Sequence, residues 1–203
     1  MNKSFIIKII VLCLVTIKVS AIEKVILFGD SLMAGYGLPK EQHLSVVLQN
    51  SLELERHNIQ IINGSVSGST SASGLNIAEW TLSENNIDLM ILCLGANDML
   101  RGIQPNETEK NLEKIIKIAQ SKKIEIILAG MLAPTSYGTK YKKNFDQIYL
   151  NLSKKYDLKL IPFLLEGVAF NPDLNLSDGM HPNKEGIIVI SQTLKKNILN
   201  YIN

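Results

Sequence analysis

Short apolar runs alternate with longer helical stretches along the chain, and this alternation constrains the fold more than any other feature. The runs are continuous, as in strands buried on both faces of a sheet. We expect strands over residues 25–28, 59–62, 89–94, 124–129 and 158–161. Helices are expected over 41–55, 74–84, 106–121, 140–155 and 183–202. This order predicts an α/β fold, a three-layer α/β/α sandwich with a central five-stranded parallel sheet.

A single domain over residues 22–203 accounts for the pattern. The chain has 203 residues, which suits one α/β domain, and no linker or repeat divides it after residue 22. The expected third helix opens on Pro105, where Asn106 can cap the helix and Glu109 can reach back to it.

The first 21 residues have the pattern of a secretory signal peptide. Lys3 and Lys8 precede a short apolar run over residues 9–17, and small residues precede the end at Ala21. A membrane anchor is the alternative, but spanning a bilayer takes about 20 apolar residues and lysines interrupt this run. We expect a cleaved signal peptide over 1–21 and a periplasmic or secreted protein.

The charge of the remaining chain gives no sign of nucleic-acid binding. Three of the 21 basic residues lie in the first 21 positions, which leaves 18 basic against 19 acidic residues. Cys93 is then the one remaining cysteine, so no internal disulfide can form. It lies in an apolar run, where buried packing is expected rather than reactivity.

Small polar residues gather where the expected strands end. They form four clusters, at 29–32, 63–68, 95–98 and 177–182. The first three follow a strand directly, and the fourth precedes the last helix. Ligands of open parallel sheets bind outside the carboxyl ends of the strands, so these clusters are expected to meet at one edge.

The residue types in the clusters suit acyl transfer. Ser31 would be the nucleophile, and a serine hydroxyl needs an adjacent base to take its proton. His181 is the histidine in such a loop, and Asp178 three residues earlier can orient its ring. His43 and His57 belong to a charged helix and its end, where a surface position is expected.

Stabilisation of a tetrahedral oxyanion needs preorganised donors. Candidates are the backbone N–H groups of Ser31 and Gly68 and the side-chain amide of Asn97. Each cluster alone also fits a turn or a helix cap. Their occurrence together, in this order and at strand ends, favours catalysis.

The four segments together resemble the SGNH, or GDSL, hydrolase superfamily over nearly the whole of residues 22–203. The matching blocks are residues 26–32, Gly68, the Gly95-x-Asn97-Asp98 segment and the Asp178-x-x-His181 segment. The resemblance is greatest to the secreted bacterial thioesterases, lysophospholipases and arylesterases. It implies a flavodoxin-like fold and an esterase or thioesterase with no cofactor and no metal.

The resemblance also implies residue roles. Ser31, Asp178 and His181 would form the catalytic triad, and Ser31, Gly68 and Asn97 the oxyanion hole. Asp30 would have a structural part outside the triad. Ala96 departs from the family, whose members usually carry a second glycine there. Substrates would be small molecules: short or medium acyl esters, acyl thioesters and lysophospholipids. We expect a monomer that meets a membrane only briefly, through its substrate.

Other readings are weaker. The α/β-hydrolase fold needs Gly-x-Ser-x-Gly, which the chain lacks. A nucleotide site could cite Gly35-Tyr36-Gly37, but its third glycine is replaced by Lys40. Metal hydrolysis would need clustered histidines and carboxylates. An exported, non-catalytic lipid- or acyl-binding protein on the same scaffold is the alternative from another class.

One more expectation concerns residues 132–141. This segment follows the fourth strand and mixes proline, glycine and small polar residues with two tyrosines. We expect a mobile lip over an acyl-binding groove. An ordinary connecting loop is the alternative.

Overall fold

A computed structural model describes residues 22–83 and 86–202. The predicted signal peptide lies outside these residues. Within them the chain forms a parallel five-stranded sheet with the order β2-β1-β3-β4-β5. Its strands are β1 (Lys24–Gly29), β2 (Gln60–Asn63), β3 (Leu89–Cys93), β4 (Glu125–Ala129) and β5 (Lys159–Ile161).

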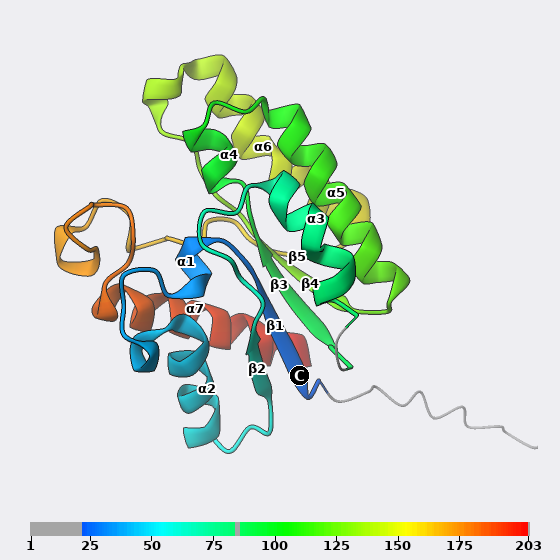
Figure 1. Cartoon of the computed structure of the whole chain (residues 1–203), viewed down its shortest axis with the longest axis vertical. Helices are drawn as coiled ribbons and strands as arrows, with labels where there is room; N and C mark the ends of the chain where they lie inside the picture. The colour runs from blue at the N-terminus through cyan, green and yellow to red at the C-terminus, as the bar shows by residue number, and fades with distance from the viewer. Residues whose placement is uncertain (1–21, 84–85, 203) are drawn as a thin grey trace, which may run out of the picture.

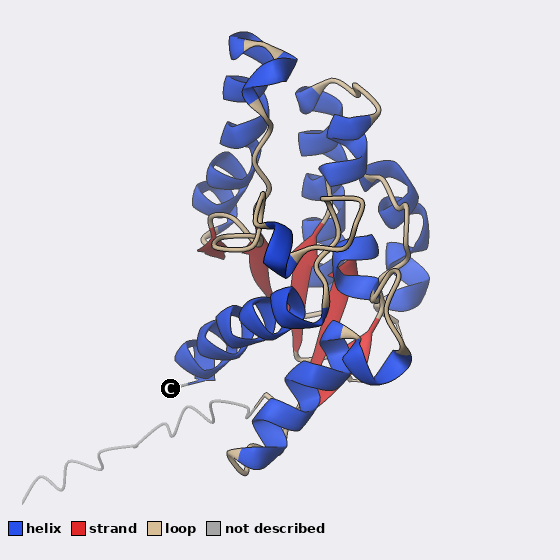
Figure 2. Cartoon of the chain, turned by 90° about the vertical axis from the view of Figure 1, so that its left-hand side faces the viewer, coloured by secondary structure: helices blue, strands red, loops and turns tan. Residues whose placement is uncertain are grey.

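Helices cover both faces of this sheet, as Figures 1 and 2 show. The helices are α1 (Ser31–Ala34), α2 (Leu44–Leu54), α3 (Ser71–Thr81), α4 (Ala96–Leu100), α5 (Pro105–Ser121), α6 (Thr139–Tyr156) and α7 (Lys184–Ile202). Short 3-10 turns span Lys40–Gln42, Thr135–Tyr137 and Pro172–Leu174. In Figure 1, α3, α5 and α6 lie on one side of the sheet and α2 and α7 on the other. The predicted three-layer sandwich is confirmed.

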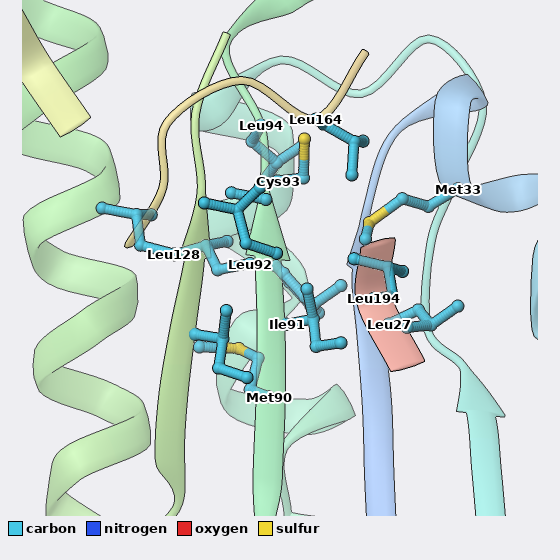
Figure 3. Close-up of a cluster of buried hydrophobic side chains, with 14 of the residues drawn as sticks. Leu27, Met33, Met90, Ile91, Leu92, Cys93, Leu94, Leu128, Leu164 and Leu194 are labelled. Carbon is cyan, nitrogen blue, oxygen red and sulfur yellow. The ribbon is translucent and has the colours of Figure 1, made fainter. Parts of the chain in front are cut away.

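The core lies mainly on the three inner strands. All five residues of β3 are buried, and side chains from β1, β3, β4 and α7 meet there (Figure 3). Cys93 is buried in this cluster, as predicted, and burial raises the pKa of its thiol well above the ordinary value. The two edge strands, β2 and β5, are only partly buried, so full burial was a wrong prediction for both. An edge strand has a neighbour on one side only.

Two helix starts differ from their predictions. Helix α3 begins at Ser71 rather than at 74, because Thr70 and Ser73 form a reciprocal capping box. Helix α5 begins at Pro105, with Gln104 as its N-cap, so the capping role predicted for Asn106 is wrong. Proline is favoured at the first helical position, where its missing N–H costs nothing.

The strand order reverses around β1, which has β2 on one side and β3 on the other. Crevices outside such a switch point are the usual ligand sites of doubly wound sheets. Ser31 follows β1, and Asn97 follows β3. The fold therefore brings these two predicted site residues to the edge where a substrate would bind.

Candidate active site

Ser31, His181 and Asp178 form a continuous chain of hydrogen bonds. His181 Nε2 lies 2.9 Å from Ser31 Oγ, and His181 Nδ1 lies 2.7 Å from Asp178 Oδ2. Ser31 is the first residue of α1, whereas His181 precedes α7 by three residues. The structure thus joins two residues that are 150 positions apart in the sequence.

The loop of Asp178 holds its carboxylate in the charged form. Oδ1 accepts hydrogen bonds from the backbone N–H groups of His181 at 3.0 Å and Met180 at 2.9 Å. These bonds, with that to the His181 ring, lower the pKa of Asp178 to about 2. A charged carboxylate only accepts, so Nδ1 of His181 carries a proton. In the neutral ring Nε2 is then free to accept the Ser31 hydroxyl proton.

Asp30 lies beside the serine but has different partners. Its Oδ1 accepts the Leu32 N–H at 3.0 Å and caps α1, and its Oδ2 lies 3.3 Å from Asn97 Nδ2. The side chain is 1 % exposed, and burial raises the pKa of Asp30 to about 6. In the described chain it is Asp178, not Asp30, that is hydrogen-bonded to the His181 ring.

Asn97 joins two of the strand-end clusters. Its amide Nδ2 lies 3.1 Å from the Ser69 carbonyl as well as 3.3 Å from Asp30. Gly68, just before Ser69, is exposed and has φ +79°, a conformation that glycine adopts without strain. The Gly68 carbonyl accepts a hydrogen bond from Arg101 at 3.1 Å. The loop before α3 is therefore held against both ends of α4.

Asp98 had no predicted role, and the structure gives it one. Its buried carboxylate accepts hydrogen bonds from the backbone and hydroxyl of Ser71 and from the Thr108 hydroxyl. These bonds tie the starts of α3 and α5 to α4. No local sequence pattern pointed to this role, because Ser71 and Thr108 lie in other helices.

The remaining two histidines lie away from the triad. His43 is half-buried, and its Nε2 lies 3.1 Å from the Leu38 carbonyl. His57 is also half-buried, 3.9 Å from Glu55. No group of three metal-ligating side chains occurs in the described ranges.

A cavity of about 730 Å³ opens beside the triad, and Ser31 and His181 contribute to its wall. The rest of the wall is mostly apolar, including Leu32, Met99, Met131, Phe163, Leu165 and Ala169. Small-molecule sites commonly have volumes of about 300–1,000 Å³ and such linings. The first four residues of the predicted lip, 132–135, also line the cavity, while the mobility of the lip stays a prediction.

Comparison with known proteins agrees with this geometry. The sequence model of the GDSL-like lipase/acylhydrolase family matches residues 27–187. The chain belongs to this family. The predicted family and an enzyme that hydrolyses acyl esters or thioesters are thereby confirmed.

Individual relatives of this acylhydrolase span nearly its whole length. It is 33% identical to an arylesterase of Vibrio mimicus over 182 residues, 90% of this chain and 91% of the relative. It is 31% identical to thioesterase 1/protease 1/lysophospholipase L1 of Escherichia coli K12, covering 95% and 91%. The crystal structure of the esterase EstA from Pseudoalteromonas sp. superposes with a TM-score of 0.85 at 30% identity, covering 89% and 99%.

Proposed function

We propose that this acylhydrolase works through an acyl-enzyme on Ser31. The observation that carries the proposal is the pair of hydrogen bonds from Ser31 through His181 to Asp178. The Ser31 oxygen attacks the acyl carbonyl carbon while His181 Nε2 takes the hydroxyl proton. His181 then gives that proton to the leaving alcohol or thiol. Water, deprotonated by His181, attacks the acyl-enzyme, releases the acid and restores Ser31.

Three donors stabilise the oxyanion in this proposal: the N–H groups of Ser31 and Gly68 and the Asn97 amide. Ser31 is the first residue of α1, so its N–H has no acceptor within the helix. Glycine at 68 leaves open space where a Cβ would stand, and substrate can approach the backbone. The Asn97 amide turns to the oxyanion by giving up its longer contact, that to Asp30.

The substrates follow from the cavity. Its apolar wall suits the acyl chain of short or medium esters, thioesters and lysophospholipids. Two relatives are named arylesterase and thioesterase 1/lysophospholipase L1, and these names refer to the same classes of substrate. A non-catalytic acyl-binding protein would not need a histidine hydrogen-bonded to the serine and a carboxylate hydrogen-bonded to that histidine.

The processing and the location of the enzyme are also part of the proposal. We assign residues 1–21 as a cleaved signal peptide and 22–203 as the hydrolase domain, which places the enzyme in the periplasm or outside the cell. In the part of the chain that the structure describes, no helix is long and apolar enough to cross a membrane. The enzyme works as a monomer without cofactor, metal or nucleic acid, and meets a membrane briefly through its substrate.

A fluorophosphonate tests the mechanism, because its phosphorus forms a bond to the serine oxygen as fluoride leaves. We expect one label on the wild type at Ser31, and p-nitrophenyl ester hydrolysis that falls about 10⁴-fold or more in Ser31→Ala. Ser121→Ala, at the exposed end of α5, is the matched control and keeps both properties. Equal activity of Ser31→Ala and wild type would disprove the acyl-enzyme on Ser31.

A further inference from the structure

Exposed apolar side chains gather at the mouth of the active-site cavity. Leu100, Leu132, Phe170 and Met180 all line it, yet each is 40 to 86 % exposed. We call these four residues the apolar rim. They come from α4, the segment after β4, the segment after β5 and the loop of Asp178. Large apolar side chains left exposed around one opening often mark an interaction surface.

Phe170 is the most exposed member of the rim, at 86 %. Its φ is +62°, a region that side-chain-bearing residues adopt rarely and at a cost in free energy. Hydrogen bonds on both sides fix the backbone there, from Ala169 N to Leu165 O and from Asn171 N to Val168 O. The chain thus keeps a strained backbone that leaves an aromatic ring in water, which adds little to folding.

The position of the rim limits what can cover it. A second copy of the chain or a protein partner seated on all four residues would close the mouth through which substrate reaches Ser31. A fluid lipid surface would bury the rim and also supply acyl chains directly to the cavity. Residues 22–203 are close to neutral, with 18 basic and 19 acidic residues, so contact with lipid would be apolar rather than electrostatic.

We propose that the apolar rim docks this acylhydrolase on a lipid–water interface, with the cavity mouth facing the acyl chains. This inference rests on the proposed function, because it takes the cavity as the acyl site. It goes further in making the protein's own side chains, and not only the substrate, the contact with the membrane.

The chain supplies its own controls. Leu54 and Trp80 are 85 % and 71 % exposed, as much as the rim, but they lie at the ends of α2 and α3. Those helices begin near the catalytic edge of the sheet and run away from it. Trp80 is about nine residues, or roughly 13 Å, along α3 from its first residue.

Binding to vesicles tests the docking without turnover. In the mature chain with Ser31→Ala, cosedimentation with phosphatidylcholine vesicles gives a partition coefficient. We expect Phe170→Ser and Met180→Ser each to lower it roughly fivefold to tenfold, because bound apolar area is lost. Leu54→Ser should leave it unchanged, and high salt should not release the protein. Equal losses in Leu54→Ser and Phe170→Ser, or no vesicle binding at all, would overturn the proposal.

Tryptophan emission gives a second test, which uses variants that still bind vesicles. Trp80 is the only tryptophan, and its emission should not change when vesicles are added. In a Trp80→Phe background, the emission of the Phe170→Trp variant should instead shift to shorter wavelength when vesicles are added. The opposite pattern would overturn the proposal.

Size-exclusion chromatography tests the other occupant of the apolar rim. A dimer that Phe170→Ser dissociates would assign the rim to a second copy of the chain and overturn the proposal. If Ser31 is not the nucleophile, the ester-hydrolysis assay shows it, whereas the vesicle-binding results do not depend on it.

Discussion

The Tyr36 ring lies against the imidazole of His181, with ring centroids 4.4 Å apart and planes inclined by 36°. A turn presents this ring, since Leu38 N donates to Gly35 O and both flanking glycines have positive φ. A Cβ on Gly35 would meet the His43 ring, and one on Gly37 would meet Leu176 of the triad loop. The Gly35-Tyr36-Gly37 sequence therefore holds an aromatic ring on the triad histidine.

We predict that Tyr36→Leu lowers kcat about threefold to thirtyfold with little change in KM. An aromatic face attracts a nearby cation by about 0.5–2 kcal/mol, and His181 is a cation only after it takes the serine proton. Tyr36→Phe keeps the ring and should retain wild-type kcat. Steady-state kinetics on a soluble ester distinguishes the two variants. Equal kcat in Tyr36→Leu and wild type would show that the contact has no part in catalysis.

Asp30→Asn should change how stability depends on pH. Burial raises the pKa of Asp30 from 3.8 to about 6, so the folded state binds a proton that the unfolded state has lost between these values. Its ionisation therefore lowers the free energy of unfolding as pH rises from about 4 to 6, by up to about 3 kcal/mol. Asparagine does not titrate, and it can still cap α1.

Urea unfolding of wild type and Asp30→Asn at pH 4 and pH 7 measures this effect. Relative to wild type, the variant should gain stability at the higher pH. Asp178 acts in a different window, because its pKa of about 2 confines its loss of stability to acid below about pH 4. Parallel pH dependences of the two proteins would contradict an uncharged Asp30 at pH 4.

Gly95→Ala should destabilise the fold by about 2 kcal/mol or more. Gly95 has φ +121°, and an added Cβ would lie 2.4 Å from the Tyr149 hydroxyl, which is hydrogen-bonded to the Leu94 carbonyl. Ala96 is the first residue of α4 and has no positive φ, so Ala96→Gly should cost less than about 1 kcal/mol. Thermal unfolding compares the two, and a larger loss in Ala96→Gly would contradict this reading.

The sequence was enough to predict the sheet, because buried parallel strands leave continuous apolar runs that helices interrupt. It did not reveal α1 and α4, which have four and five residues and are too short to show helical periodicity. Asp30 caps the first, and the second follows the positive φ of Gly95. Both depend on local geometry rather than on hydrophobic pattern.

The predicted site residues could be found because they end strands of a parallel sheet, whose carboxyl ends meet at one edge. Tyr36 was missed because its partner, His181, is 145 positions away and no local pattern links them. The part of Asp98 was missed for a similar reason, since Ser71 and Thr108 reach it from other helices. Contacts between residues of different elements become visible only in the folded structure.

An ion pair holds the wall of the cavity at Ala133. Asp146 accepts the Ala133 N–H at 2.9 Å, Lys142 donates to the Ala133 carbonyl at 2.7 Å, and the two side chains lie 2.7 Å apart. Both backbone groups of one residue are thus bound by one pair from α6. The start of the predicted lip is fixed, whatever the mobility of the residues that follow.

Asp146→Asn should therefore loosen this wall and broaden the acyl-length preference. The substitution leaves an amide oxygen that can still accept the Ala133 N–H, but it removes the charge that strengthens this hydrogen bond and holds Lys142. Values of kcat/KM for p-nitrophenyl esters from acetate to dodecanoate should differ less among themselves than in wild type. Lys143→Met, on the exposed neighbour of Lys142, is the control and should keep the wild-type profile. If Asp146→Asn lowers kcat/KM by the same factor for every ester, the pair stabilises the fold but does not select the acyl chain.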